Sequence, residues 1–128
     1  MSQPDFKRPG SRDGPGPLSG LERAVLTAMF KGEGEDLATL RAQLAKATVA
    51  SRTHSGVGFV SRIQVPDAIP LLAEATALRL RPVLAAHPHL TERAEFLLQV
   101  RGGRLAVLEA YCVEGGWPAN EAEFRVVG

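Results

Sequence analysis

The sequence is poor in several features that often decide a protein's class. It has a single cysteine, Cys112, so no disulfide can form within the chain, as is usual in a reducing cytoplasm. Aromatic residues make up only 5% of the 128 residues, so a core must rest on aliphatic side chains. No apolar run approaches the ~20 residues of a membrane-spanning helix, and residues 1–20 lack the apolar segment of a signal peptide. These absences favour a cytoplasmic protein without a membrane partner.

Neither sign of charge predominates in the sequence. With 15 basic and 14 acidic residues the net charge is +1, which gives no overall attraction to nucleic acid or to an anionic membrane. Hydrophobic residues make up 45% of the sequence, enough to form a core in a chain the size of one domain. The composition predicts a globular protein and argues against nucleic acid as a partner.

Motifs for binding a metal or a cofactor are absent from the sequence. It contains neither a Cys-x-x-Cys nor a His-Glu-x-x-His pattern, and its glycines do not form a phosphate-binding loop. The histidines, His54, His87 and His89, lack the further ligands that a tetrahedral zinc site needs. We therefore expect no metal and no cofactor.

Proline and glycine dominate the first residues of the chain. Residues 1–17 contain four prolines and three glycines, and few apolar side chains. Such a segment cannot bury enough apolar area to offset the entropy lost on ordering. We expect a flexible tail over residues 1–17 and a single α+β domain over residues 18–128.

Two helices are expected directly after this tail. Ser19 and Glu22 match a capping box, in which each side chain accepts a hydrogen bond from the other's backbone amide. Helical spacing of apolar residues follows until Gly32, and a second such segment begins with acidic residues at 35 and 36 and ends near Lys46, as the helix dipole favours. The two apolar stripes are Leu21, Val25, Ala28 and Met29, and then Leu37, Leu40 and Leu44.

From Thr48 onwards the spacing changes to alternation. Residues 48–53 and 57–65 are rich in β-forming residues and are separated by turn-forming residues, so they predict two paired strands. In the second strand, Phe59 and Ile63 share an apolar face that Ser61 interrupts.

The segment 67–88 has mixed signals, because good helix formers overlap with a short alternating run. We favour a loop or helical turn through Ala75 and then an edge strand near Ala77–Ala85, since proline within strands is confined to edges and bulges. Residues 124–127 could add a further short edge strand.

The strongest local signal is a β-hairpin over Ala94–Val113. Gly102-Gly103 between two β-rich runs is typical of a two-residue turn with positive φ. The predicted fold is therefore α+β: an N-terminal two-helix unit packed on an antiparallel sheet of four to five strands, with this Gly-Gly hairpin at its centre.

Simple pairing outward from the turn assigns the two faces of the hairpin. Phe96 then lies opposite Glu109, and both belong to the apolar face. The same register places three apolar residues on the outer face, namely Leu97, Leu108 and Ala110.

Three short motifs, Gly-Val-Gly-Phe at 56–59, Leu-Glu-Ala-Tyr at 108–111 and Trp-Pro at 117–118, resemble those of small uncharacterised bacterial proteins. In those proteins a Gly-x-Gly-Phe strand precedes a hairpin that ends in Leu-Glu-x-Tyr. The resemblance covers about residues 53–118. It implies a single α+β domain with a strand near Leu78, and it implies no activity.

A carboxylate on an apolar face is the first candidate site. Burial would raise the pKa of Glu109 unless a donor or cation compensates. One interpretation is a general acid or base in a small pocket, with His54 and Tyr111 as candidate catalytic partners and Trp117 as a further binding residue. The other, which we favour, is a structural carboxylate, because a catalytic carboxylate needs a placed partner.

The outer face of the predicted sheet is the second candidate site. Arginines on several strands would point outward there, with aliphatic residues among them. Such a mixture suits a protein interface, clustered arginines can bind phosphate or carboxylate groups, and scattered apolar residues are also common on solvated faces. The candidate binding residues on this face are Arg62, Arg79, Arg81, Arg101, Arg104, Leu97 and Leu108.

The leading hypothesis is a small non-enzymatic bacterial interaction or regulatory protein. It would form a homodimer or bind another protein through the outer sheet face. One alternative is a small-molecule-binding protein or modest hydrolase with a pocket around Glu109. A weaker alternative is an anion or nucleic-acid binder that uses the arginines of the sheet.

Overall fold

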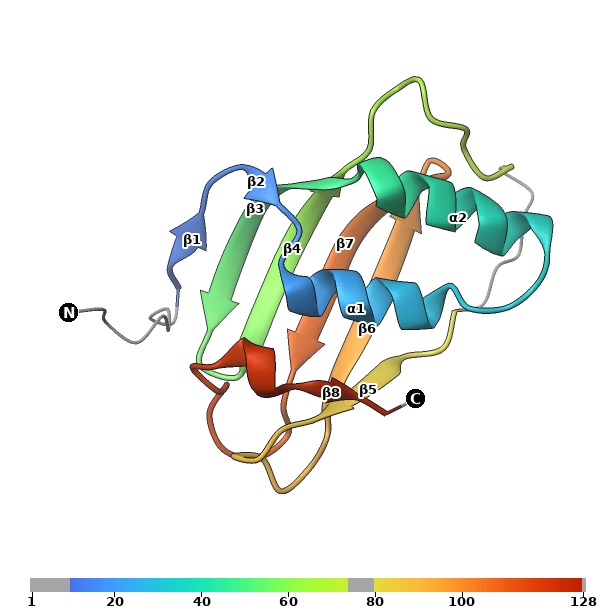
Figure 1. Ribbon diagram of the computed structural model, residues 1–128. Helices are drawn as coiled ribbons and strands as arrows, with labels where there is room; N and C mark the ends of the chain where they lie inside the picture. Colours follow the sequence, from blue (N-terminus) through green and yellow to red (C-terminus); the bar gives the residue numbers. More distant parts are fainter. Residues whose placement is uncertain (1–9, 74–79, 128) are drawn as a thin grey trace.

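The computed structural model describes residues 10–73 and 80–127 of the chain. Within these ranges the chain forms two α-helices and an antiparallel eight-stranded sheet. Both helices lie on the same face of the sheet (Figure 1). The α+β class agrees with the sequence prediction, but the sheet has more strands than the four to five expected.

The helices begin and end where the local signals predict. Helix α1 spans Gly20–Met29, and both hydrogen bonds of its capping box form: Ser19 Oγ accepts from the Glu22 amide at 3.0 Å, and Glu22 Oε1 accepts from the Ser19 amide at 2.8 Å. Helix α2 spans Glu35–Lys46 and directs Leu40 and Leu44 into the core.

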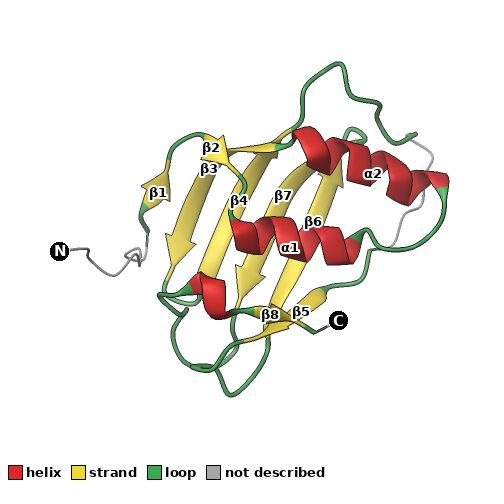
Figure 2. Ribbon diagram, viewed as in Figure 1, coloured by secondary structure: helices red, strands yellow, loops and turns green. Residues whose placement is uncertain are grey.

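The strands follow the order β1-β3-β4-β7-β6-β5-β8, and β2 also pairs with β3 (Figure 2). Each neighbouring pair is antiparallel. The bounds are β1 Arg12–Asp13, β2 Gly16–Pro17, β3 Thr48–Ser55, β4 Gly58–Gln64, β5 Val83–Ala86, β6 Ala94–Arg101, β7 Arg104–Tyr111 and β8 Arg125–Val126.

Two of the additional strands come from the segment expected as a flexible tail. Arg12 pairs with Thr53, and Gly16 pairs with Val49, so β1 and β2 extend the sheet beyond β3. The composition of this segment did not reveal this pairing, because main-chain groups can add to a sheet edge whatever the side chains.

The other end of the sheet also differs from the expectation. Strand β5 begins at Val83, later than the expected start at Ala77, and residues 74–79 lie outside the described ranges. Strand β8 pairs with β5, so β5 is not the edge strand.

The Gly-Gly turn forms as predicted, but the hairpin register does not. Gly102 has φ 58° and Gly103 has φ 76°, as a two-residue hairpin turn requires. Val100 pairs with Leu105, but Gln99 pairs with Val107, so Ala106 is an extra residue in β7. A bulge of one residue moves every later side chain to the opposite face.

The expected facing of three residues is therefore wrong. Leu108 and Ala110 point into the core and are 0% and 4% exposed. Glu109 pairs with Leu97 and lies on the outer face, so no buried carboxylate exists at this position. Leu97 does lie on the outer face, as predicted.

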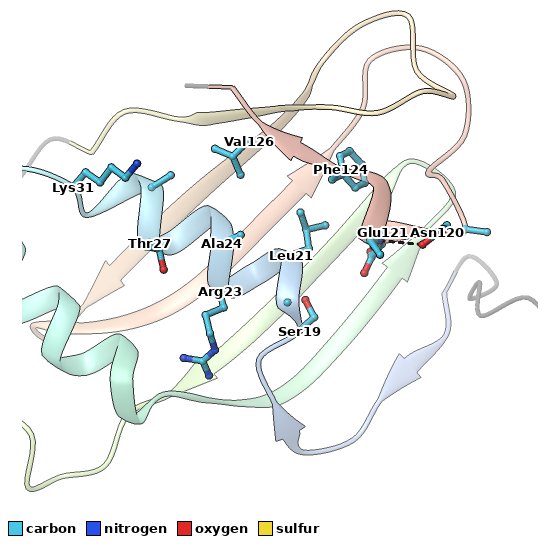
Figure 3. Close-up of a pocket in the computed structure, with 14 residues that line it drawn as sticks. Ser19, Leu21, Arg23, Ala24, Thr27, Lys31, Asn120, Glu121, Phe124 and Val126 are labelled. Carbon is cyan, nitrogen blue, oxygen red and sulfur yellow. Dashed lines mark hydrogen bonds between the residues drawn. The ribbon is translucent and has the colours of Figure 1, made fainter.

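The C-terminal segment folds back onto the helix side of the sheet. A short 3-10 helix, η1 (Glu121–Glu123), precedes β8, and both contact α1. A groove remains between α1 and this segment (Figure 3). Within the described residues, no helix is long and apolar enough to cross a membrane.

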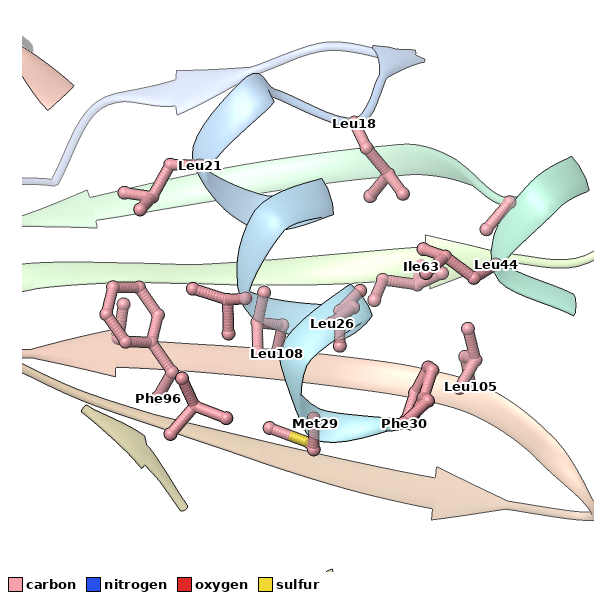
Figure 4. Packing of buried hydrophobic residues seen from close by; sticks show 14 of the residues in the cluster. Leu18, Leu21, Leu26, Met29, Phe30, Leu44, Ile63, Phe96, Leu105 and Leu108 are labelled. Atoms are coloured by element: carbon pink, nitrogen blue, oxygen red, sulfur yellow. The ribbon is translucent and has the colours of Figure 1, made fainter. Parts of the chain in front are cut away.

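The core fills the layer between the helices and the sheet. Leu26 of α1 and Phe30, directly after its last residue, pack toward Leu105 and Leu108 of β7, and Phe96 of β6 lies farther along the same layer (Figure 4). Each of these five side chains is at most 1% exposed, so each stabilises the fold by about 1.5–3 kcal/mol.

Candidate functional site

The sheet face that carries neither helix is open and mixed in character. Along β4 the side chains alternate strictly: Phe59, Ser61 and Ile63 are buried, and Val60 and Arg62 are exposed. Val107 belongs to this outer face as well, because it pairs with the outward-facing Arg62 and lies outside the main hydrophobic cluster. We call this surface the open face.

The register arranges the open face in rows that cross the strands. There are four rows. The first two contain acidic side chains and the last two contain arginines. The second and third rows also contain the apolar side chains of this face. Across β6, β7 and β4 the rows are Glu95 and Tyr111; Leu97, Glu109 and Val60; Gln99, Val107 and Arg62; and Arg101 and Arg104.

Tyr111 is held at the acidic end by a charge-assisted hydrogen bond. Its hydroxyl donates to Glu95 Oε2 at 2.5 Å. This bond, together with burial and the negative charges of Glu95 and Glu109, raises the pKa of Tyr111. The hydrogen bond fixes the Glu95 carboxylate on the open face.

Three of the predicted arginines, Arg62, Arg101 and Arg104, lie at one end of the open face, and their side chains differ in their partners. Arg62 is exposed on β4, and Arg101 donates to Gln99 Oε1 at 2.6 Å. Arg104 forms an ion pair with Asp67 at 3.0 Å, and Arg81 precedes β5. The prediction for Arg79 falls outside the described residues.

The candidate catalytic residues Glu109, His54 and Tyr111 lie near one another but do not share one face of the sheet. A shallow depression of about 220 Å³ is lined by all three residues. The centroid of the His54 ring, however, lies 6.5 Å from that of the buried Phe59 ring, and its Nε2 lies 3.1 Å from Asp13 Oδ2. The His54 side chain therefore lies on the helix side of the sheet. Glu109 lies on the opposite face.

Trp117 also lies on the helix side. Its ring centroid lies 5.6 Å from that of Phe59 and 5.0 Å from that of Phe124. Its Nε1 donates a hydrogen bond to Glu121 Oε2 at 2.8 Å. It covers the core and takes no part in the open face.

A buried polar network on the helix side escaped the sequence analysis. Glu22 of α1 is 0% exposed and accepts from Arg52 Nε at 2.9 Å, from Arg52 Nη2 at 2.5 Å and from the Ser61 hydroxyl. Arg52 also bonds Asp13 Oδ2 at 3.2 Å. The signal was visible in Ser61, which interrupts an apolar strand face.

Charge compensation keeps this network ionised. Burial alone would raise the pKa of Glu22, but the hydrogen bonds from Arg52, Ser61 and the Ser19 amide, and the charge of Arg52, hold it below its usual value. Burial alone would lower the pKa of Arg52, but the hydrogen bonds to Glu22 and Asp13 and the charges of these two carboxylates raise it above its usual value. The satisfied pairing gives the network a structural role that ties α1 to β3 and β4.

No protein-family model, curated protein or solved structure matches this chain. Among the described residues, no group of three His, Cys, Asp or Glu side chains could hold a metal ion. The open face is thus the strongest candidate site on the residues themselves.

Proposed function

We propose that this protein is a non-enzymatic interaction protein of the cytoplasm that forms a homodimer through the open face. One observation carries the proposal: apolar side chains occupy the middle of this face, with carboxylates at one end and guanidinium groups at the other. A surface of this kind is complementary to a second copy of itself in one orientation.

The charge layout selects the direction of the twofold axis. An axis that lies in the interface and crosses the strands reverses the rows, so Glu95 faces Arg101 of the second copy. Glu109 then lies within one strand spacing of Arg62 of the second copy. An axis parallel to the strands would bring carboxylate over carboxylate, which is unfavourable.

Association through the face is more favourable than association through an edge. Strands β1, β2 and β8 are two residues long each and occupy the two edges of the sheet. Short edge strands offer few unpaired main-chain groups to another chain. The open face instead offers Val60, which is 41% exposed, beside the half-buried Leu97, above Val107, which is itself only 7% exposed.

The test is the mass of the protein in solution, measured by light scattering after size-exclusion chromatography. We expect a dimer for the unmodified chain and a monomer for Val60→Arg, because the substitution places a desolvated charge in the middle of the interface. The matched control is Val57→Arg in the β3–β4 turn. Val57 is 45% exposed, close to the 41% of Val60, but it lies between β3 and β4 and belongs to none of the rows of the open face.

The control variant should remain a dimer with unchanged stability. A monomeric unmodified chain at concentrations of about 100 μM, or equal behaviour of the two variants, would overturn the proposal.

A further inference from the structure

The groove between α1 and the C-terminal segment lies on the helix side, away from the open face. Its volume is about 940 Å³, within the range of small-molecule sites. It runs beside α1, whose 10 residues span about 15 Å. Phe124 and Val126 line one side, and Asn120 and Glu121 close the end opposite Lys31 (Figure 3).

The chemistry of the lining is apolar inside and positive at the rim. Leu21, Phe124 and Val126 provide apolar surface. The small side chains of Ala24 and Ala28 leave the space on the α1 side of the groove unfilled. Arg23 and Lys31 are the two cations of the lining, and both are exposed.

The only carboxylate in the lining is already engaged. Glu121 Oε2 accepts a hydrogen bond from Trp117 Nε1 at 2.8 Å, which directs it toward the core side. Arg23 points away from Phe124 and Val126, so Lys31 is the cation that faces this apolar surface, at the end away from Glu121 (Figure 3). The groove therefore favours a ligand with an anionic head and a long apolar part.

We propose that this groove binds an anionic aliphatic molecule, such as a medium-chain carboxylate. Helix α1, which runs beside the groove, is about 15 Å long, enough to contact an extended chain of about ten carbon atoms. The apolar chain would lie along Leu21, Phe124 and Val126, and the carboxylate would face Lys31 at the end away from Asn120 and Glu121 (Figure 3).

Decanoate is the probe, and decyltrimethylammonium, which has the same aliphatic chain and the opposite charge, is the matched control ligand. Calorimetric titration below the micellar concentration should show decanoate binding about tenfold more tightly. The emission of Trp117, the only tryptophan, should change on binding, because its ring centroid is 5.0 Å from that of Phe124.

Two variants separate the charge from the groove itself. Lys31→Gln should abolish the preference for decanoate, whereas Lys46→Gln on α2 should keep it. Ala24→Gln should weaken both ligands about tenfold or more by obstructing the groove, and Ala45→Gln on α2 should not. Ala24 and Ala45 are both exposed helix residues, so they are matched in stability cost.

Equal affinity for the two ligands, no decanoate binding up to about 1 mM, or a loss of binding in the α2 variants would overturn the proposal. The monomeric Val60→Arg variant should bind decanoate like the unmodified chain, since the groove and the open face are independent.

Discussion

Glu22 is a carboxylate with no exposed surface, and its partners come from distant parts of the chain. Arg52 is 30 residues away and Ser61 is 39 residues away. A buried ion pair of this kind contributes little over an apolar replacement, but the loss of one partner leaves an uncompensated charge. Glu22 thus combines a local role, as part of the capping box, with a long-range role that fixes α1 on the sheet.

Glu22→Gln should therefore lower the free energy of unfolding at neutral pH by about 3 kcal/mol, measured by chemical denaturation. Glu33→Gln is the control. Glu33 is exposed, and its substitution should change stability by less than about 0.5 kcal/mol.

The same pair predicts a pH dependence. The folded-state pKa of Glu22 is lowered, so its stabilising contribution is present above the unfolded pKa and is lost as the pH falls through the folded value. The stability difference between the unmodified chain and Glu22→Gln should shrink as the pH falls below about 4.3. A difference that stays constant down to about pH 2 would show that the charge of Glu22 does not stabilise the fold.

Tyr111 offers a second measurement, because it is the only tyrosine in the chain. Its raised pKa comes first from the bond to Glu95, so ultraviolet titration of the phenolate should give a midpoint above the usual value of about 10. Glu95→Gln should move this midpoint down. An unshifted midpoint in the unmodified chain would contradict the bond between Tyr111 and Glu95.

The central hairpin marks the limit of what the sequence could predict. Its turn, like the capping box of α1, follows from neighbouring residues, and both formed as predicted. The bulge at Ala106 depends on how β7 pairs with strands on both sides, and no local pattern signals it. Because of that one residue, Leu108 was misplaced on the outer face and Glu109 in the core.

The turn also anchors α2. The Gln43 side chain is 0% exposed, donates to the Gly103 carbonyl at 2.8 Å and accepts from the Leu105 amide at 3.0 Å. The Leu72 amide donates to the same carbonyl at 3.0 Å. Helix α2, the loop after β4 and the hairpin therefore meet at one glycine.

Gly103→Ala should destabilise the fold by about 2 kcal/mol or more in chemical denaturation. Its φ of 76° strains a side chain, and a Cβ would lie 2.5 Å from the Leu72 carbonyl oxygen. Gly102→Asn is the control, because Gly102 has φ 58° and open space around it, and asparagine tolerates this conformation. Equal effects of the two substitutions would contradict the close contact at Gly103.

The whole molecule has two unlike sides. The helix side buries the core and the Glu22 network, and the open face carries the ordered rows of charge around Val60, Leu97 and Val107. The alternation of the strands predicts this face and its Leu97, Arg62 and Arg101. It could not order them into acidic and basic ends, because that order depends on the pairing of β4, β6 and β7.

The most direct test of the proposed dimer is a mixture of two charge variants, Arg101→Glu and Glu95→Arg. Each alone places like charges opposite each other across the proposed interface and should weaken dimerisation about fivefold or more, measured by light scattering over a dilution series. Mixed in equal amounts they restore both pairs, so the proposal predicts that dimers return as heterodimers. Monomers in the mixture, or dimers that neither variant weakens, would contradict a dimer formed through the open face.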